Sequence, residues 1–358
     1  MLIEEHVALA PFTTLGIGGP AKWFLTVTSE DDVAEAVRFA RGCDLPLFVL
    51  GGGSNLLIAD DGFPGVVLHM AIRRMEQEAM PEGHPLLRVG AGESWDGLVQ
   101  FAVERDLAGM ECLAGIPGTV GGTPVQNVGA YGQEVAETIA VVRCFDTQTQ
   151  AFVELSNAEC GFAYRTSIFN TTERGRYIVV RVDFRLRPDG APKLAYADLR
   201  KHFGLLVAGV SDVTTPQALP SLAEVAEAVR TIRRGKGMVF DPADPNSRSA
   251  GSFFRNPIVS HEALLHASEV AGVGVDTVPH WPAGDGMVKL PAAWLLERAG
   301  FVRGFALGNA GISTRHTLAL VNRGGATAAD VIALRERIIA DVRAQFEIEL
   351  EQEPVSVG

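Results

Sequence analysis

The sequence has few cysteines and no cluster of basic residues. Its four cysteines, Cys43, Cys112, Cys144 and Cys160, lie far apart and form no Cys-x-x-Cys pair, which argues against a zinc ribbon and a disulfide-rich scaffold. We therefore expect reduced, buried thiols. A net charge of −12 without clustered Lys and Arg also argues against nucleic acid as a partner.

The sequence also lacks a recognisable export or membrane segment. The N-terminal residues MLIEEHVALAPF have neither the basic start nor the continuous apolar stretch of a signal peptide. The longest uncharged stretch, Cys112 to Gln133, contains six Gly and two Pro, so it favours a loop-rich binding segment over a membrane helix. We expect a cytoplasmic protein that binds no membrane.

A metal site is not indicated. His261, Glu262 and His266 resemble a zincin motif, but the two histidines are five positions apart rather than four. That spacing does not place both imidazoles on one helical face in the required way. The sequence therefore predicts no metal site.

The chain length and the mixture of elements predict an α+β protein of two or three domains. At 358 residues the chain exceeds what one hydrophobic core usually organises. The apolar periodicity and capping residues mark helices and strands without regular βαβ alternation, and the stretch 204–220 reads as a loop. We expect helices over 29–42, from Trp95 to Val103, from Ser221, which forms a capping box with Glu224, and from about Thr327, with Asp330 in the capping position. We expect strands at 22–27, 46–50 and 180–186, where apolar and charged residues alternate, and in the C-terminal tail EIELEQEPV.

Two glycine-rich segments suggest a binding site for a large cofactor. Gly51, Gly52 and Gly53 follow an apolar strand and precede Ser54 and Asn55, so backbone amides and polar side chains can surround a pyrophosphate. A tight turn is the alternative reading of this segment. Neither a GxGxxG nor a GxxxxGK[ST] pattern is present, which argues against Rossmann and P-loop sites.

The second segment runs from Ala114 to Gly122 and continues to Gly132 without one charged residue. Such a backbone can closely approach a flat, neutral ring. A mere connector would not need so long an uncharged segment. We predict that this segment lines a planar ligand.

Two further segments carry candidate chemistry. Arg165 follows Tyr164 and has the forked guanidinium that suits a carboxylate, although a single Arg most often forms a surface ion pair. Ser252 lies between Gly251 and two phenylalanines, which could hold its hydroxyl in a dry pocket, although a turn is the commoner role of such a Ser.

Taken together, these segments closely resemble the UDP-N-acetylenolpyruvoylglucosamine reductase family, whose members are also called UDP-N-acetylmuramate dehydrogenases. Seven segments in order, spread over nearly the whole chain, carry the resemblance. They are TTLGIGG from Thr13, LGGGSNLL from Leu50, AGIPGTVGG from Ala114, QNVGAYGQE from Gln126, YRTSIF from Tyr164, GSFFRNP from Gly251 and the terminal LEQE.

The resemblance implies an α+β fold in which a two-subdomain, vanillyl-alcohol-oxidase (PCMH)-type unit binds FAD and a smaller α+β domain binds the substrate. The boundaries would be 1–70 and 71–238 for the FAD subdomains and 239–346 for the substrate domain, with the tail 347–358 returning to the first. It also implies a monomer in which NADPH reduces the FAD, and the FAD then reduces a UDP-linked enolpyruvyl amino sugar for peptidoglycan synthesis, and so for cell shape and division. No Cys or His in the glycine-rich segments is placed for a flavin linkage, so we expect non-covalent FAD.

The resemblance also assigns roles to individual residues. Arg165, Ser252 and Glu353 would be catalytic: Arg165 and Glu353 would stabilise the substrate carboxylate, and Ser252 would donate the proton. Tyr164, Tyr196, Lys236 and Asn256 would bind the substrate, and Tyr196 places the chain in the longer of the family's two subtypes. The cofactor residues would be Gly51, Gly52, Gly53, Ser54, Asn55, Ile116, Pro117, Gly118, Gly121, Gly122, Asn127, Gly129 and Ala130.

Two departures from the family pattern leave alternatives open. The tail has Pro354 after the second acid rather than between the two, so Glu351 rivals Glu353 as the catalytic acid. Arg298 follows Glu297 where a substrate-contacting Gln or Glu is common, and Arg298 receives no role. Two other functions also stay open, namely a different flavin-dependent oxidase or dehydrogenase on the same scaffold and a nucleotide-sugar binding protein without turnover.

Overall fold

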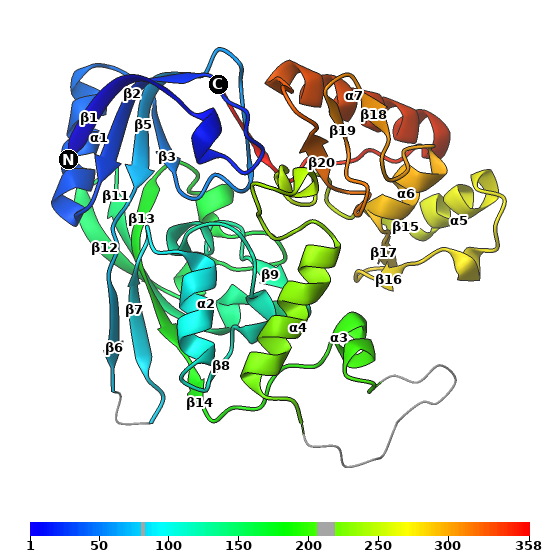
Figure 1. Cartoon of the computed structure of the whole chain (residues 1–358), viewed down its shortest axis with the longest axis horizontal. Helices are drawn as coiled ribbons and strands as arrows, with labels where there is room; N and C mark the ends of the chain where they lie inside the picture. The colour runs from blue at the N-terminus through cyan, green and yellow to red at the C-terminus, as the bar shows by residue number, and fades with distance from the viewer. Residues whose placement is uncertain (80–82, 206–218) are drawn as a thin grey trace. The chain divides into compact units, whose positions relative to one another are not determined.

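The computed structural model describes residues 1–79, 83–205 and 219–358 (Figure 1). These residues form two compact units that both consist of discontinuous stretches of chain. Unit 1 comprises Met1–Val7, Ala21–Gly52 and Pro64–Arg234, and unit 2 comprises Ala8–Pro20, Gly53–Phe63 and Gly235–Gly358. The boundaries 1–70, 71–238 and 239–346 stay a prediction. Of the loop predicted at 204–220, residues 206–218 lie outside the described residues.

Unit 1 contains a four-stranded sheet of order β1-β2-β5-β3, with β3 and β5 parallel. Helix α1 (Glu30–Gly42) connects β2 to β3. It begins as predicted at Ser29, whose hydroxyl and the Asp32 carboxylate form a capping box, and it buries Val33, Val37 and Ala40. The strands are β1 (Leu2–Ala8), β2 (Pro20–Val27), β3 (Leu47–Leu50) and β5 (Phe63–Met70).

The second sheet of unit 1 has five antiparallel strands in the order β12-β11-β13-β7-β6 (Figure 1). The predicted alternation is confirmed in β13, where Val180, Val182 and Phe184 are buried. The indole of Trp95, which begins α2, packs 6.0 Å from the Phe184 ring between centroids. The elements are β6 (Met75–Glu78), β7 (Leu86–Gly90), β11 (Ile139–Asp146), β12 (Ala151–Ser156), β13 (Tyr177–Arg185) and α2 (Trp95–Val103).

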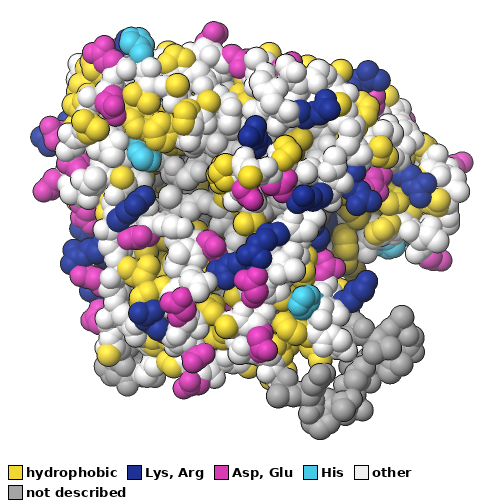
Figure 2. Space-filling view, in the orientation of Figure 1, with side chains coloured by type: hydrophobic (Ala, Val, Ile, Leu, Met, Phe, Trp, Pro, Cys, Tyr) yellow, Lys and Arg dark blue, Asp and Glu magenta, His cyan; other side chains and the backbone are white. Residues whose placement is uncertain are grey.

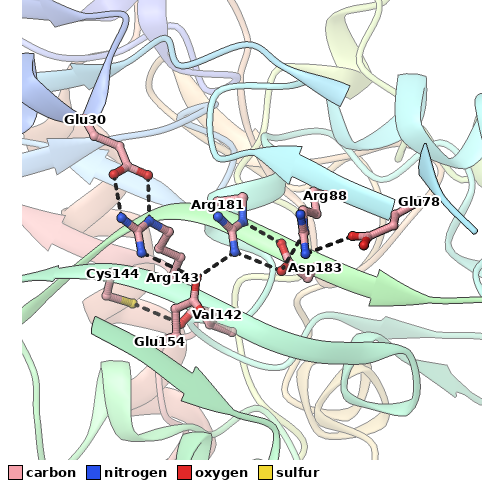
Figure 3. Close-up of polar contacts among 9 residues, drawn as sticks. All are labelled: Glu30, Glu78, Arg88, Val142, Arg143, Cys144, Glu154, Arg181 and Asp183. Atoms are coloured by element: carbon pink, nitrogen blue, oxygen red, sulfur yellow. Dashed lines mark hydrogen bonds and ion pairs between the residues drawn. The ribbon is translucent and has the colours of Figure 1, made fainter. Parts of the chain in front are cut away.

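A row of alternating charges crosses this sheet (Figure 3). Arg181 pairs with Glu154 at 2.8 Å and with Asp183 at 2.7 Å, and Arg88 approaches Asp183 at 3.8 Å. Arg143 continues the row from Glu154 to Glu30 of α1, and Glu78 of β6 ends it beside Arg88. Asp183 is therefore buried although it lies on the polar face of β13, because two guanidinium groups compensate its charge.

Short elements of unit 1 surround the second glycine-rich segment. Strand β8 (Leu107–Ala108) pairs with β14 (Arg187–Pro188), and β9 (Gly129–Ala130) pairs with β10 (Gln133–Glu134). Helix α3 (Ala197–His202) follows Tyr196. Helix α4 (Leu222–Gly235) begins with the predicted capping box of Ser221 and Glu224.

In unit 2, helix α7 (Ala328–Phe346) supplies much of the hydrophobic core. Its predicted capping box of Thr327 and Asp330 is confirmed, and its buried side chains include Leu334 and Ile338. The Asp60 carboxylate accepts hydrogen bonds from the first two backbone N–H groups of the helix at 2.7 and 3.0 Å. This contact ties the segment 53–63 to α7.

Two small antiparallel sheets and two shorter helices complete this core. The sheets have the orders β15-β17-β16 and β18-β19-β20. The elements are β15 (Ile258–Ser260), α5 (His261–Val270), β16 (Trp281–Pro282), β17 (Met287–Lys289), α6 (Ala292–Arg298), β18 (Ala306–Leu307), β19 (Ala310–Ile312) and β20 (Leu320–Asn322).

The C-terminal strand is shorter than predicted. Strand β21 (Val355–Val357) pairs in parallel with β4 (Leu56–Ile58), so the tail lies beside a segment of the first 70 residues. The residues before β21 make only an isolated antiparallel bridge, between Gln352 and Phe254. The alternation in EIELEQEPV therefore reflects anchoring of the tail rather than a long strand.

Candidate active site

The two glycine-rich segments of unit 1 touch at backbone distance. A Cβ on Gly52 would lie 2.5 Å from the Cα of Gly118, and a Cβ on Gly51 would lie 2.8 Å from the Thr119 hydroxyl oxygen. No residue with a side chain fits at Gly52 without moving the backbone. The segments that were predicted to hold the pyrophosphate and the flavin ring are thus adjacent at Gly52 and Gly118.

Thr119 was not predicted as a site residue from the sequence. Its hydroxyl oxygen is buried and has no hydrogen-bond partner among the described residues. A buried hydroxyl without a partner is destabilising, and a polar atom of a ligand would satisfy it. The signal was available, since Thr119 lies between the predicted contacts Gly118 and Gly121.

Hydrogen bonds and packing within unit 1 hold one side of the segment from Gly115 to Gly122. The Gly115 N–H donates to the Asp96 carboxylate at 2.7 Å, and the Gly115 carbonyl accepts from Arg233 Nε at 3.2 Å. A Cβ on Gly121 would lie 2.6 Å from that of Ala91, whereas a Cβ on Gly122 would meet no described atom within 4 Å. One side of the segment is therefore packed, and the backbone at Gly122 is open to a ligand.

Asn127 links the second glycine-rich segment to the segment that carries Arg165. Its amide nitrogen donates to Glu134 at 2.8 Å and to the Ala163 carbonyl at 3.1 Å, and its amide oxygen accepts from the Ala136 N–H at 3.1 Å. Asn127 is 1% exposed. Because these bonds use both amide hydrogens, a cofactor contact at Asn127 would involve its backbone.

Arg165 lies in a tight turn beside this segment. Its backbone has φ +55°, and its guanidinium carbon lies 5.6 Å from the centre of the Tyr164 ring. One of its terminal nitrogens lies 3.5 Å from where a Cβ on Gly129 would be. The absence of a side chain at Gly129 thus leaves room for the guanidinium next to the predicted flavin segment.

Arg233 of α4 adds a second guanidinium to this part of unit 1. Burial lowers the pKa of Arg233, and the positive charge of Arg165 lowers it further, while Tyr131 and Asp96 act in the opposite direction. Two guanidinium groups that are close enough for their positive charges to interact favour the binding of an anionic ligand. Arg233 could not be predicted from the sequence, because its neighbours Asp96, Tyr131 and Arg165 are more than 60 positions away.

Tyr196 is placed by unit 1 against the same segment. Its ring meets that of Tyr131 edge to face, with the centroids 5.3 Å apart. Tyr131 is almost fully buried, whereas Tyr196 is 45% exposed. Unit 1 thus brings Tyr164, Arg165 and Tyr196 together with the residues predicted to bind the flavin.

Unit 2 brings a second set of predicted residues together. The tail runs antiparallel to the segment that carries Ser252, since the Glu353 N–H donates to the Phe253 carbonyl at 2.9 Å. The Asn55 amide donates to the Glu353 carbonyl at 3.4 Å. Ser252 is half-buried beside Phe253, which is fully buried. Asn55, Ser252 and Glu353 are therefore neighbours.

The two rival acids have different surroundings. The Glu351 side chain is 76% exposed and faces Arg255 at 3.8 Å. Glu353 is half-buried next to Phe253. A carboxyl group that acts on a substrate requires a site that excludes water, and Glu353 meets this requirement better.

The following contacts and burial place the other residues of unit 2 that were considered from the sequence. Asn256 accepts a hydrogen bond from the Ala292 N–H at 3.0 Å and so fixes the start of α6. Lys236 is half-buried directly after α4. Glu297 accepts a hydrogen bond from the Thr317 hydroxyl at 2.6 Å, and Arg298 lies over the Trp294 ring.

Gly53 anchors the end of the first glycine-rich segment within unit 2. Its φ of +60° favours glycine, and a Cβ there would lie 1.8 Å from the Phe12 carbonyl oxygen. The Gly53 carbonyl accepts from the Thr14 N–H at 3.2 Å. The TTLGIGG motif thus supports the glycine segment.

Neither a metal-binding cluster nor a membrane-spanning helix occurs within residues 1–79, 83–205 and 219–358. No group of three or more His, Cys, Asp and Glu side chains there could hold a metal ion. No helix in that part of the chain is long and apolar enough to cross a membrane. On the face drawn in Figure 2, Lys and Arg side chains are interspersed with Asp and Glu.

Comparison with known proteins defines the class. Residues 21–151 match a family model described as an FAD binding domain, and residues 242–357 match that of the UDP-N-acetylenolpyruvoylglucosamine reductase C-terminal domain. The protein is thus an FAD-dependent oxidoreductase with a vanillyl-alcohol-oxidase (PCMH)-type cofactor unit and a further α+β domain, as predicted.

Full-length relatives define the family. UDP-N-acetylenolpyruvoylglucosamine reductases of Thermobifida fusca and Streptomyces coelicolor are 48% and 47% identical to this chain, over 99% of it and over 98% and 90% of their own lengths. The crystal structure of the Thermus caldophilus UDP-N-acetylenolpyruvylglucosamine reductase matches with a TM-score of 0.67 and 28% identity, and the match covers 100% of both chains. The chain belongs to the UDP-N-acetylenolpyruvoylglucosamine reductase family.

Proposed function

We propose that this protein reduces UDP-N-acetyl-3-O-(1-carboxyvinyl)-glucosamine to UDP-N-acetylmuramate in peptidoglycan synthesis, with NADPH as the electron donor and FAD as the cofactor. The observation that carries the proposal is full-length membership of the family together with a cofactor cradle that fits. In that cradle, Gly51 and Gly52 meet Gly118, and the buried Thr119 hydroxyl still needs a partner. The protein would act in the cytoplasm as a monomer.

FAD, when bound, would supply the chemistry of hydride transfer between NADPH and the terminal carbon of the enolpyruvyl group. Gly51 to Asn55 would hold its pyrophosphate, and the backbone from Ile116 to Gly122 and from Asn127 to Ala130 would lie along its ring. The open position above Gly122 and the buried Thr119 hydroxyl support this assignment. No Cys or His lies within these segments, which supports non-covalent binding.

The residues of the chain would stabilise the charge that the reduction creates and supply the proton. Arg165 would bind the substrate carboxylate through its fork, and Glu353 would donate a hydrogen bond to the same group. Ser252 would give its hydroxyl proton to the carbon that bears the carboxylate. Tyr164, Tyr196, Lys236 and Asn256 would bind the rest of the UDP-sugar. The contact between the Glu353 backbone and Phe253, next to Ser252, supports a shared site for the two groups.

An anaerobic two-step reaction tests the proposal. One equivalent of NADPH should bleach the flavin of the purified holoenzyme, and the UDP-enolpyruvyl sugar should then restore its absorbance while UDP-N-acetylmuramate forms. UDP-N-acetylglucosamine, which lacks the enolpyruvyl double bond, is the matched control and should leave the flavin reduced. Flavin that stays reduced with the enolpyruvyl sugar as well would refute the proposed function.

A further inference from the structure

A buried carboxylate in unit 1, that of Glu111, has no part in the proposed chemistry and yet joins three segments of the chain. Glu111 is 1% exposed. Its Oε2 accepts from the Gly109 N–H at 2.9 Å, and its Oε1 accepts from the Gln133 side-chain amide at 3.1 Å and from the Lys193 backbone N–H at 2.9 Å. A buried carboxylate depends on such donors, so the carboxylate and these three groups fix one another.

Two of these three hydrogen-bond donors belong to residues that are close in sequence to tyrosines of the candidate site. Gln133 follows Tyr131, and Lys193 precedes Tyr196, by a few positions. Between them, a Cβ on Gly132 would lie 3.4 Å from the Cβ of Ala195. The Tyr131 and Tyr196 rings then meet with their centroids 5.3 Å apart. The contacts therefore continue from the Glu111 carboxylate to the tyrosine pair.

Cys112 reinforces the same junction. Its thiol donates to the Lys193 carbonyl at 3.1 Å, and its backbone N–H donates to the Gln133 side-chain oxygen at 2.9 Å. The backbone N–H and the backbone carbonyl of Lys193 are thus held by two consecutive residues, Glu111 and Cys112. The Lys193 ammonium, by contrast, pairs with Glu137 at the surface, where both side chains are more than one third exposed. Such exposed pairs contribute little.

We propose that Glu111 is a positioning residue whose carboxylate fixes the segment 193–196 against Tyr131–Gln133 and so sets the place of the Tyr196 phenol. The inference rests on the proposed contact of Tyr196 with the substrate. Glu111 itself touches no reacting group. Its loss is therefore expected to change substrate affinity rather than the chemical step.

Glu111→Gln tests this role with almost no change in volume. A neutral amide cannot offer two acceptor oxygens, so its NH₂ group must face either the Gly109 N–H or the pair of donors on the other side. We expect the KM for the UDP-enolpyruvyl sugar to rise about tenfold, the scale on which hydrogen bonds to a charged group contribute. FAD content and kcat should change little. Glu137→Gln is the matched control, because it weakens the exposed pair with the same Lys193, while its remaining side-chain oxygen can still accept from the Glu134 backbone N–H. Its KM should stay normal.

A double-mutant cycle with Tyr196→Ala separates positioning through Tyr196 from any other effect. Tyr196→Ala alone should raise KM, and adding Glu111→Gln to it should raise KM no further. Full additivity, or a normal KM in Glu111→Gln while Tyr196→Ala is impaired, would overturn the inference and leave the proposed substrate contact intact. A normal KM in Tyr196→Ala would instead remove that contact, and the inference with it.

Glu111→Asp gives a second variant if Glu111→Gln does not fold. It keeps the charge, but its shorter side chain cannot reach the Gln133 amide and the Lys193 N–H together. The same rise in KM and the same lack of additivity with Tyr196→Ala are expected. A folded Glu111→Asp enzyme with a normal KM would contradict the positioning role.

Discussion

Gly52 lies so close to Gly118 that a Cβ on Gly52 would stand 2.5 Å from the Cα of Gly118. Gly52→Ala should therefore push the two glycine-rich segments apart and weaken FAD binding. We expect a purified variant with at least a several-fold lower ratio of flavin to protein absorbance. Gly42→Ala is the control, because a Cβ there meets no described atom within 4 Å, and it should keep its flavin. Full flavin content in Gly52→Ala would show that the contact is not needed for the cofactor.

Ser252→Ala tests the proposed proton donor. The change removes one hydroxyl from a half-buried position beside Phe253, so the fold and the FAD content should survive. NADPH should still bleach the flavin at a normal rate, whereas the enolpyruvyl substrate should reoxidise it about 10²-fold more slowly, the scale of a general acid. Stopped-flow absorbance separates the two steps. Normal reoxidation would make Ser252 a structural residue.

Glu353→Gln and Glu351→Gln form a matched pair. Glu353 adjoins Phe253 and is half-buried, whereas the Glu351 side chain is 76% exposed beside Arg255. We expect Glu353→Gln to slow flavin reoxidation by at least about tenfold, because it alone would lose a group that acts on the substrate carboxylate. Glu351→Gln should react at the normal rate. The reverse order of effects would identify Glu351 as the acid.

The thiols should differ sharply in reactivity. Burial raises the pKa of the Cys112 and Cys160 thiols to about 12 and also raises that of Cys144. Cys43 is exposed, so the expectation that all four thiols are buried was wrong for this one. Because the thiolate is the reactive form, these three thiols stay protonated and unreactive at pH 8. A thiol reagent should modify Cys43 alone in the native protein and all four cysteines after unfolding. Peptide mapping checks this, and rapid native labelling of Cys112 would contradict it.

Asp146 should contribute to stability at neutral pH and lose that contribution in acid. Hydrogen bonds from the Arg176 guanidinium hold the pKa of this carboxyl well below its usual range. A depressed pKa in the folded state means that the stabilisation is present above the unfolded pKa, about 4, and disappears as the pH falls towards the folded value.

Asp146→Asn should therefore lower the free energy of unfolding at pH 7 by about 2 kcal/mol, the scale of a hydrogen bond to a charged group. Its melting temperature should also fall less steeply than that of the natural sequence between pH 5 and 2. Asp276→Asn, at an exposed position, serves as the control. Thermal unfolding across this pH range would detect both effects. Parallel curves for the variant and the natural sequence would contradict the role of Asp146.

The sequence predicted those parts of the fold that depend on local rules. The helices that begin at Ser29, Ser221 and Thr327 follow capping boxes, which need only residues three positions apart. The burial of Asp183 could not be predicted, because it depends on Arg88 from another strand. Strand β21 was placed too early for the same reason, since its partner β4 is remote in the chain.

The same division holds for the candidate site. Glycine-rich runs and short motifs identified the segments, because a close backbone approach leaves a visible mark in composition. The contacts that hold these segments in place leave no such mark in the sequence. Asp96 and Arg233 hold Gly115 from α2 and α4, and Glu111 joins Gln133 to Lys193. Each of these contacts depends on the tertiary fold and on a side chain that is common in other roles.

The parallel pairing of β4 with β21 joins residues 56–58 to residues 355–357, which are remote in the chain. During synthesis β4 leaves the ribosome long before β21 exists, so β4 lacks this neighbour while most of unit 2 is being made. Unit 1, which ends at Arg234, has all its residues before β21 is added. Loss of β21 should therefore leave unit 1 able to fold and disturb unit 2, at the segment next to Glu353.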